Sequence, residues 1–152
     1  MNLSPFWVTG FTDGEGTFYV GINKNPTMKI GYQVLPEFRI VQHEKDIKLL
    51  YALKSFFQGG VVRVNHDERM ELRIRSIDSL NKKVIPHFDK FPLNTQKKFD
   101  FLKFKKIIEL INRSKHLEKE GLINIIEIAA LMNRQDKVKA NAILVELKND
   151  KI

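Results

Sequence analysis

Two acidic residues stand among three glycines near the start of the sequence, and they are its best candidates for holding a metal ion. Asp13 and Glu15 are two positions apart, so they cannot share one face of a regular helix. They can converge if a helix ends between them, which the glycines at positions 14 and 16 would permit. Carboxylate and carbonyl oxygens at a helix C-terminus suit Mg²⁺, whose charge would offset the helix dipole. The segment therefore predicts a magnesium site with few protein ligands.

Two common loop motifs do not fit this segment. A calcium-binding EF-hand would need further oxygen ligands and a closing acid, but Phe18, Tyr19 and Val20 follow instead. A phosphate-binding loop would need a Gly-Lys-Ser/Thr sequence, which does not follow the glycines. The acids are therefore interpreted as a metal site of another kind.

Gly10 and Gly14 stand four positions apart, on one face of the predicted helix. With no side chains at these two positions, this face can approach another element closely. That element could be a second helix, or it could be the sheet of the same chain. The sequence leaves both alternatives open.

The rest of the sequence alternates between strand and helix patterns. Ser4 followed by Pro5 predicts a helix start, with a hydroxyl N-cap before proline at the first helical position. Pro36 lies within a predicted strand and needs a bulge or a sheet edge there. The predicted order is helix 5–13, strands 17–24 and 31–41, helix 44–57, hairpin strands 61–65 and 69–75, then helices 76–88, 95–113, 119–132 and 137–148.

This order predicts an α+β fold in which helices gather on one face of an antiparallel sheet. Neither a linker nor an internal repeat is found, so residues 1–152 are predicted to form a single domain. Its core is expected at about 5–115, with C-terminal helices at about 117–149. The periodicity of helix 44–57 predicts core positions for Ile47, Leu50, Tyr51 and Leu53.

The other face of the sheet is predicted to be polar and basic. It could simply be solvated, as the outer side of an antiparallel sheet usually is. However, arginine reads guanine edges, asparagine and glutamine read adenine, and a two-stranded ribbon can enter the major groove. The residues predicted to contact DNA are Tyr19, Asn23, Lys24, Lys29, Gln33, Glu37, Arg39, Arg63, Asn65, Arg69, Glu71, Arg73 and Arg75.

The composition favours an anionic partner and excludes several kinds of chemistry. The formal net charge of +8 is typical of nucleic-acid-binding proteins. The absence of cysteine excludes disulfides, thiol catalysis and cysteine-based zinc sites. No apolar run approaches the roughly 18 residues of a membrane span, and residues 1–5 resemble neither a signal nor a transit peptide. The abundance of Lys, Ile, Asn and Phe indicates an AT-rich coding genome such as that of an organelle.

The segment Val8 to Gly16, VTGFTDGEG, resembles the LAGLIDADG motif at Gly10, at both acids and at the glycines around them. The predicted order of strands and helices is similar to that family as well, and FPLNTQKKFDF at 91–101 is similar to the segment that carries its active-site lysine. The resemblance covers about residues 6–110 and is to single-motif homing endonucleases. The sequence departs from the family pattern at its Val-Thr start, at Glu15 where Asp is commoner, and at Asp46 where some relatives carry a basic residue.

The resemblance implies the αββαββα fold, whose sheet forms a DNA-binding saddle, and it implies roles for individual residues. Glu15 and the Gly14 carbonyl would bind metal, and Asp13 would be structural or lie close to these ligands. Gln42 would orient water, and Lys97 would stabilise charge at the phosphate or assist proton movement. The motif helices of two domains would pack side by side. The implied dimer interface consists of Phe6, Trp7, Gly10, Asp13 and Gly14.

The activity implied is cleavage of both strands of a near-palindromic duplex DNA by a homodimer, leaving short 3′ overhangs. Mg²⁺ would be the cofactor, Mn²⁺ would replace it, and Ca²⁺ would bind without supporting cleavage. The expected partners are double-stranded DNA and a second copy of the chain, and no membrane is expected among them. The expected location is an organelle, specifically the mitochondrion. Two alternatives stay open: an intron maturase, which would bind intron RNA, and a DNA-binding protein that does not cut.

Overall fold

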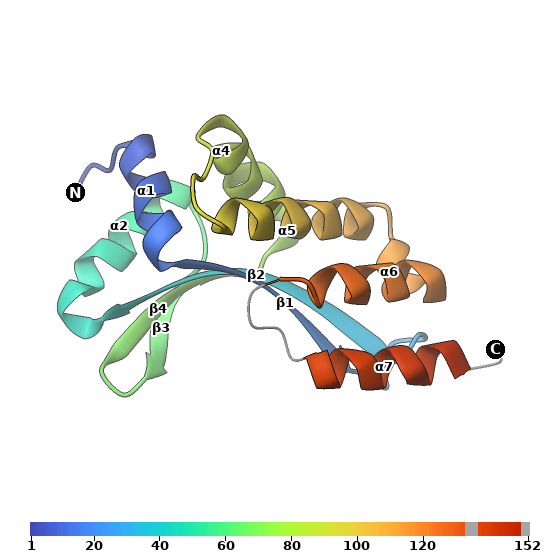
Figure 1. Cartoon of the computed structure of the whole chain (residues 1–152). Helices are drawn as coiled ribbons and strands as arrows, with labels where there is room; N and C mark the ends of the chain where they lie inside the picture. Colours follow the sequence, from blue (N-terminus) through green and yellow to red (C-terminus); the bar gives the residue numbers. More distant parts are fainter. Residues whose placement is uncertain (133–136, 150–152) are drawn as a thin grey trace. The chain divides into compact units, whose positions relative to one another are not determined.

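The computed structural model describes residues 1–132 and 137–149. The chain forms two compact units, one of residues 1–18 and 37–98 and the other of residues 19–36 and 99–152. A four-stranded sheet in the order β1-β2-β4-β3 runs through it, and the first two strands belong partly to each unit (Figure 1). The antiparallel pairings of β4 with β2 and β3 confirm the predicted α+β class.

The first unit contains the N-terminal helix and the β3–β4 hairpin. Its helix α2 contacts both hairpin strands, so that one face of the hairpin is covered within the unit. The elements lying wholly or mainly in this unit are α1 (Pro5–Glu15), β2 (Tyr32–His43), η1 (Glu44–Asp46), α2 (Ile47–Phe57), β3 (Val61–His66), β4 (Arg69–Ile74), α3 (Ile77–Ser79), η2 (Leu80–Val84) and α4 (Ile85–Lys90).

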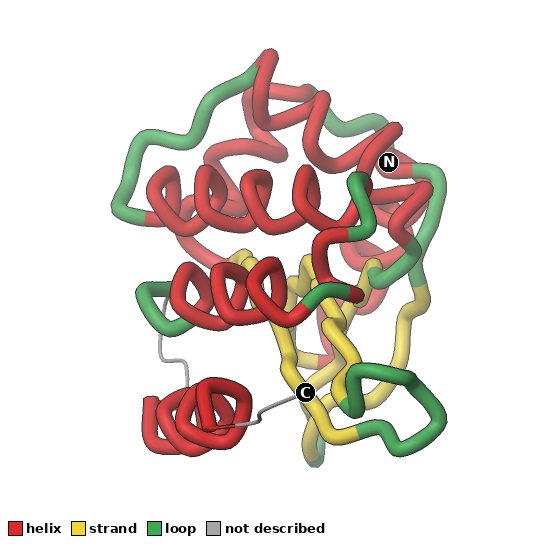
Figure 2. Tube along the Cα trace, turned by 90° about the vertical axis from the view of Figure 1, so that its right-hand side faces the viewer, coloured by secondary structure: helices red, strands yellow, loops and turns green. Residues whose placement is uncertain are grey.

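The second unit contains most of β1 and the C-terminal helices. Helices α6 and α7 contact each other, and Figures 1 and 2 both show them as neighbours. Their buried side chains, among them Leu122, Ile126 and Ile143, belong to the core of this unit. Its elements are β1 (Gly16–Lys24), α5 (Lys97–Asn112), η3 (Lys115–Leu117), α6 (Lys119–Ala129) and α7 (Lys137–Asn149). None of the described helices combines the length and apolar character needed to span a membrane.

Burial alternates largely as predicted along β1 and β2, except that Glu37 is buried between Pro36 and Phe38, whereas β3 does not alternate and only its Val62 is partly buried. Pairing of β2 with β4 begins at Phe38, so the missing N–H of Pro36 leaves no gap in that part of the ladder. The predicted boundaries of the hairpin strands differ from the observed ones by one residue at two places. Asp67 lies in the turn between these strands with a φ of 50°.

Three predictions about helices are corrected by the structure. The first helix continues through Glu15 instead of stopping at Asp13, and it ends at Gly16 with an extended φ of −83°. The predicted helix 76–88 is interrupted by the π-helical turn η2, just before Pro86, whose ring would clash with a regular turn. Tyr51 is 51% exposed, because Leu50, Leu53 and Phe57 form the inward stripe of α2.

Aromatic rings fill the core of the first unit. Phe38 is fully buried, and its ring centroid lies 5.2 to 5.6 Å from those of Phe18, Phe57 and Phe88. Phe18 lies on β1 and Phe38 on β2, whereas Phe57 belongs to α2 and Phe88 to α4. Phe38 therefore joins four elements of the unit.

We expect Phe38→Ala to lower the free energy of unfolding by about 3–5 kcal/mol, because it removes buried surface and leaves a cavity. Urea denaturation followed by circular dichroism measures this change. Tyr51→Ala is the matched control and should cost about 1 kcal/mol or less, since Tyr51 is half exposed. Equal losses for the two variants would contradict the described core.

Candidate functional site

One face of α1 is open and carries large apolar side chains. Phe6 is 76% exposed and Trp7 is 43% exposed, while Val8, Thr9 and Thr12 on the other side are buried. An added Cβ at Gly10 or Gly14 would meet no atom within 4 Å. Gly10 therefore does not pack against the sheet of this chain, and the alternative of a close approach by a second helix fits better.

Gly16 has a different use from the one that the sequence suggested. A Cβ at this position would lie 2.6 Å from Cγ2 of Thr12, and the backbone N–H of Gly16 donates to the Thr12 carbonyl. The glycine gives room for the passage from helix to strand, and its φ is one that any residue can adopt. Because the helix continues through Glu15, the two motif acids do not converge in the way expected from the sequence.

Asp13 holds a loop of its own unit. Its carboxylate accepts hydrogen bonds from the backbone N–H groups of Asn94 (3.0 Å) and Thr95 (3.0 Å) and from the Thr95 hydroxyl (2.8 Å). Desolvation by partial burial acts to raise the pKa of Asp13, but these hydrogen bonds and the charge of Lys97 outweigh it, so the pKa is lowered. Asp13 thus fixes the start of α5, where Lys97 lies.

Glu15 is exposed at the C-terminal end of α1, in the last turn, whose carbonyl groups have no partner within the helix. An exposed carboxylate beside backbone carbonyls is an all-oxygen donor set, which fits a hard divalent cation. Within residues 1–132 and 137–149, no group of three or more His, Asp or Glu side chains could hold a metal ion. A metal ion bound at Glu15 would therefore need further ligands from water, phosphate or a second domain.

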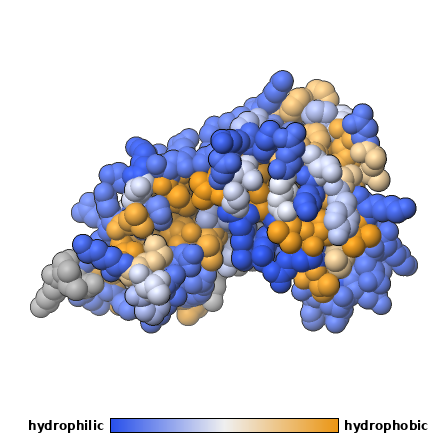
Figure 3. Space-filling model, turned by 180° about the vertical axis from the view of Figure 1, so that it is seen from behind, coloured by the Kyte–Doolittle hydropathy of each residue, from blue (hydrophilic) through white to orange (hydrophobic). Residues whose placement is uncertain are grey.

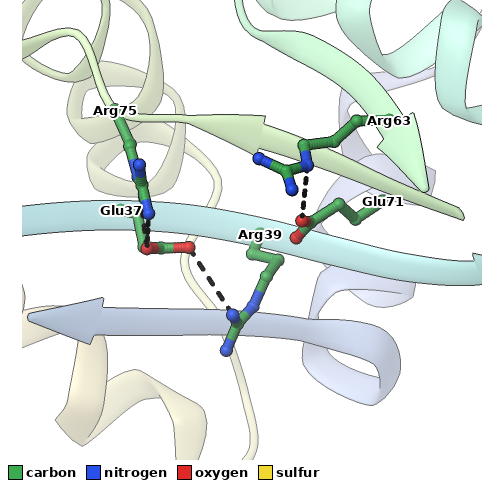
Figure 4. Close-up of polar contacts among 5 residues, drawn as sticks. All are labelled: Glu37, Arg39, Arg63, Glu71 and Arg75. Carbon is green, nitrogen blue, oxygen red and sulfur yellow. Dashed lines mark hydrogen bonds and ion pairs between the residues drawn. The ribbon is translucent and has the colours of Figure 1, made fainter. Parts of the chain in front are cut away.

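The predicted catalytic residues Gln42 and Lys97 lie in the same unit as Glu15. The Phe18 and Phe38 rings are in contact, at 5.2 Å between centroids, which sets β1 against β2 at that point. The neighbouring strands β1 and β2 run in opposite directions (Figure 4). Gln42 follows Phe38 by four residues and α1 ends three residues before Phe18, so Gln42 and the end of α1 lie toward the same end of the strand pair. The Gln42 Nε2 donates to the Val41 carbonyl at 2.8 Å.

The polar face of β2, β3 and β4 carries acids beneath arginines. Glu37 is only 4% exposed and Glu71 only 5% exposed. Glu37 lies between Arg39 and Arg75, and Glu71 lies beside Arg63 (Figure 4). The two acids were predicted to contact DNA themselves, but in this structure their carboxylates are covered and hold arginine side chains.

The residues predicted to contact DNA are divided between the two units. Those in the first are Glu37, Arg39, Arg63, Asn65, Arg69, Glu71, Arg73 and Arg75; those in the second are Tyr19, Asn23, Lys24, Lys29 and Gln33. In the second unit, Lys139 Nζ donates to Asn23 at 3.1 Å, and Lys24 lies 3.8 Å from Glu146. Helix α7 therefore occupies part of the polar surface that the sequence assigned to DNA.

A buried hydrogen-bond chain beneath α1 was not foreseen from the sequence. The Thr9 hydroxyl donates to the Phe91 carbonyl at 2.9 Å and lies 3.0 Å from Nε2 of His87. A hydroxyl has one hydrogen, so it must accept from His87, which places the imidazole proton on Nε2. Burial lowers the pKa of His87 from 6.5 to about 4. This histidine is therefore a neutral structural residue that supports the helix carrying Glu15.

The low pKa of His87 predicts that acid destabilises the fold. Below pH 6.5 the unfolded chain takes up a proton that the folded chain accepts only near pH 4, so stability is complete above pH 6.5 and falls between these values. At about pH 5 the loss should be about 2 kcal/mol. Urea denaturation at about pH 7 and pH 5 measures it. The control, His87→Gln, keeps a donor for Thr9 without titrating, and an unchanged pH dependence in this variant would contradict the assignment.

Hydrophobic side chains also reach the surface, as the view from behind shows (Figure 3). Those on α1 were predicted from the motif, and their exposure supports an interface there. The contact of Asp13 with the Asn94-Thr95 loop was missed, although these two residues favour helix starts and lie three and two positions before Lys97, the first residue of α5.

Comparisons with known proteins agree with this geometry. A family model described as LAGLIDADG endonuclease matches residues 8–108. A probable intron-encoded endonuclease 2 from Neurospora crassa is 42% identical over 133 residues, which are 86% of this chain and 29% of that protein. The DNA endonuclease I-CeuI of Chlamydomonas moewusii is 31% identical, over 87% of this chain and 63% of its own length.

Solved structures are similar as well. The homing endonuclease I-TnaI is 56% identical with a TM-score of 0.93, covering 97% of this chain and 99% of that one. I-SmaMI bound to an uncleaved DNA target in the presence of calcium ions is 36% identical with a TM-score of 0.91, covering 95% of this chain and 50% of that one. The chain spans 25% to 29% of the length of the first three curated relatives that it matches.

Proposed function

This chain belongs to the LAGLIDADG endonuclease family, and we propose that it is a site-specific DNA endonuclease that cuts both strands of a near-palindromic duplex as a homodimer. The observation that carries the proposal is the position of Glu15. It is an exposed carboxylate at the end of a helix whose glycine face is open. Relatives named as intron-encoded endonucleases support the same activity and an origin in an organelle gene, which we assign to the mitochondrion.

We propose a homodimer because residues 1–152 carry one copy of the motif, and a second copy of the chain would supply the second one. One Glu15 supplies one carboxylate, and cutting two strands requires two sites. Two α1 helices packed through Gly10 and Gly14 would bring two Glu15 side chains to the same end of the interface. Phe6 and Trp7, both exposed on α1, would then become buried.

The metal fits the residues present. Glu15 would bind it through the carboxylate and Gly14 through the backbone carbonyl, and we propose Mg²⁺, with Mn²⁺ as a substitute. A bound divalent ion supplies activation of water and stabilisation of charge at the phosphate. Ca²⁺ is proposed to support binding without cutting, in line with the calcium complex of I-SmaMI with an uncleaved target.

The chain's own residues provide positioning around this site. Asp13 holds the Asn94–Thr95 loop by its hydrogen bonds and so fixes the residue where α5 begins, Lys97. The Lys97 ammonium would stabilise negative charge on the phosphate, and the Gln42 amide would orient water. The arginines of β2, β3 and β4 would contact bases in the major groove.

A cleavage assay tests the proposal. The recombinant chain is incubated with duplex DNA of the intron-free host locus, with Mg²⁺ or with Ca²⁺, and the ends are sequenced. Double-strand cuts at one position with short 3′ overhangs, in Mg²⁺ only, are expected. Site-specific binding without cuts in Mg²⁺ would indicate a DNA-binding protein that does not cleave, and tighter binding to the intron RNA than to DNA would indicate a maturase.

A further inference from the structure

The polar face of β2, β3 and β4 has a defined arrangement of charges. The pairing register sets Arg39 directly opposite Arg73, and Glu71 directly opposite Arg63. If the pairing of β2 with β4 is extended by one pair beyond Phe38 and Ile74, Glu37 lies opposite Arg75. Like charges directly opposite each other on a sheet repel, so the Arg39–Arg73 pair needs a neighbouring acid to stabilise it.

Glu37 supplies that acid and contacts two arginines at once. Its Oε1 lies 3.2 Å from Nη2 and 3.4 Å from Nε of Arg75, and its Oε2 lies 3.6 Å from Nη1 of Arg39. Figure 4 shows the carboxylate between the two guanidinium groups, one from its own strand and one from across the sheet. The Oε2 atom is buried and has no hydrogen-bond partner.

Because Glu37 is buried, its contacts restrict the positions that the Arg39 and Arg75 side chains can take. A carboxylate that is 4% exposed is stable only while opposite charges face it. If Arg75 and Arg39 both turned away to bind DNA phosphates, Glu37 would be left charged and without a partner. The acid therefore keeps both arginines at fixed positions on the face, although their own side chains remain 44% and 32% exposed.

Arg75 keeps donors for another ligand. An arginine has five N–H donors. Glu37 accepts the Nε donor and one Nη2 donor of Arg75, so three donors of the Arg75 side chain remain. Paired donors at a fixed position suit a guanine edge, whereas a mobile arginine binds any phosphate within reach. We propose that Glu37 is a positioning residue for sequence reading, which holds Arg39 and Arg75 toward bases; this rests on the proposed endonuclease function.

Glu71 repeats the arrangement with one arginine. It is 5% exposed, its Oε1 lies 3.5 Å from Nε of Arg63, and its Oε2 is also buried without a hydrogen-bond partner. It provides a matched comparison, because Glu71→Gln changes the charge of the same face by the same amount. Glu37→Gln and Glu71→Gln should relax the preference for different base pairs.

The test selects duplexes from a random 30-bp library in Ca²⁺ with the full chain, and sequencing gives the base preference at every position. Glu37→Gln is expected to lower the preference at the positions read by Arg39 and Arg75 by about tenfold. Affinity for unrelated DNA should hold or rise, since one negative charge is removed. Glu68→Gln, which changes an acid that is 73% exposed, should leave the preferences unchanged.

The two arginines locate the positions that Glu37 controls. Arg75→Ala should relax a subset of the positions relaxed by Glu37→Gln, and adding Glu37→Gln to it should have little further effect there. A wild-type preference retained in Glu37→Gln would overturn the proposal, and so would an equal loss at every position, which indicates a general structural role. A wild-type chain that selects no sequence at all would instead overturn the proposed function.

Discussion

Replacing Glu15 with glutamine is expected to abolish DNA cleavage while leaving DNA binding nearly unchanged. The glutamine has the same shape, but it lacks the negative charge that a divalent ion requires. Loss of several kcal/mol of transition-state stabilisation corresponds to a decrease of at least about 10³-fold in the cleavage rate. Because Glu15 is exposed and belongs to no core, the variant should fold normally. Single-turnover cleavage in Mg²⁺ and equilibrium binding in Ca²⁺ measure the two effects separately.

Glu118→Gln is the matched control for this experiment. It removes the same charge from an exposed acid, 60% accessible in its ion pair with Lys115, and should cut at the wild-type rate. Normal cleavage by Glu15→Gln would show that the metal ligand has been assigned wrongly. Loss of binding together with cleavage would show instead that Glu15 contacts DNA.

The sequence predicted the order of the elements well because burial alternates along most of β1 and β2 and because Ser4-Pro5 marks the start of α1. The predicted order and the outward direction of Arg39, Arg63 and Arg73 agree with the structure, since a strand's period of two leaves little freedom. Tyr51 was placed wrongly because neighbouring positions on a helix differ by only about 100°, and an amphipathic pattern does not fix the edge of the buried stripe.

The site was harder to predict because its details depend on contacts distant in sequence. The spacing left open whether Asp13 converges with Glu15, and the family resemblance implied a structural role; its actual partners lie in a loop more than 80 residues away. Glu37 looked like a solvent-facing residue, and its burial arises from Arg75, which only the pairing of β2 with β4 brings near. A linear pattern states which face a side chain takes, but it does not state what covers the side chain there.

The second large effect is expected for Gly10→Leu, which should prevent dimer formation and with it double-strand cleavage. The added side chain meets no atom within 4 Å in one chain, so the monomer fold has room for it. Leucine also favours a helix over glycine by about 1 kcal/mol, so the monomer should be as stable as wild type or slightly more stable. In the proposed dimer, by contrast, the two helices approach each other closely at this residue.

A symmetric interface receives the substitution twice. Overpacking costs about 1–3 kcal/mol for each side chain, so two copies should weaken dimerisation by about 2–6 kcal/mol, which is about 30-fold to 10⁴-fold. Analytical ultracentrifugation of the chain with and without DNA measures the mass, compared with 17.8 kDa for one chain. Ser55→Leu adds the same side chain at an exposed position of α2 and should leave the mass and cleavage unchanged. A Gly10→Leu variant that remains dimeric and cuts both strands would show that the dimer does not form through this face, and the open glycines of α1 would then need another explanation.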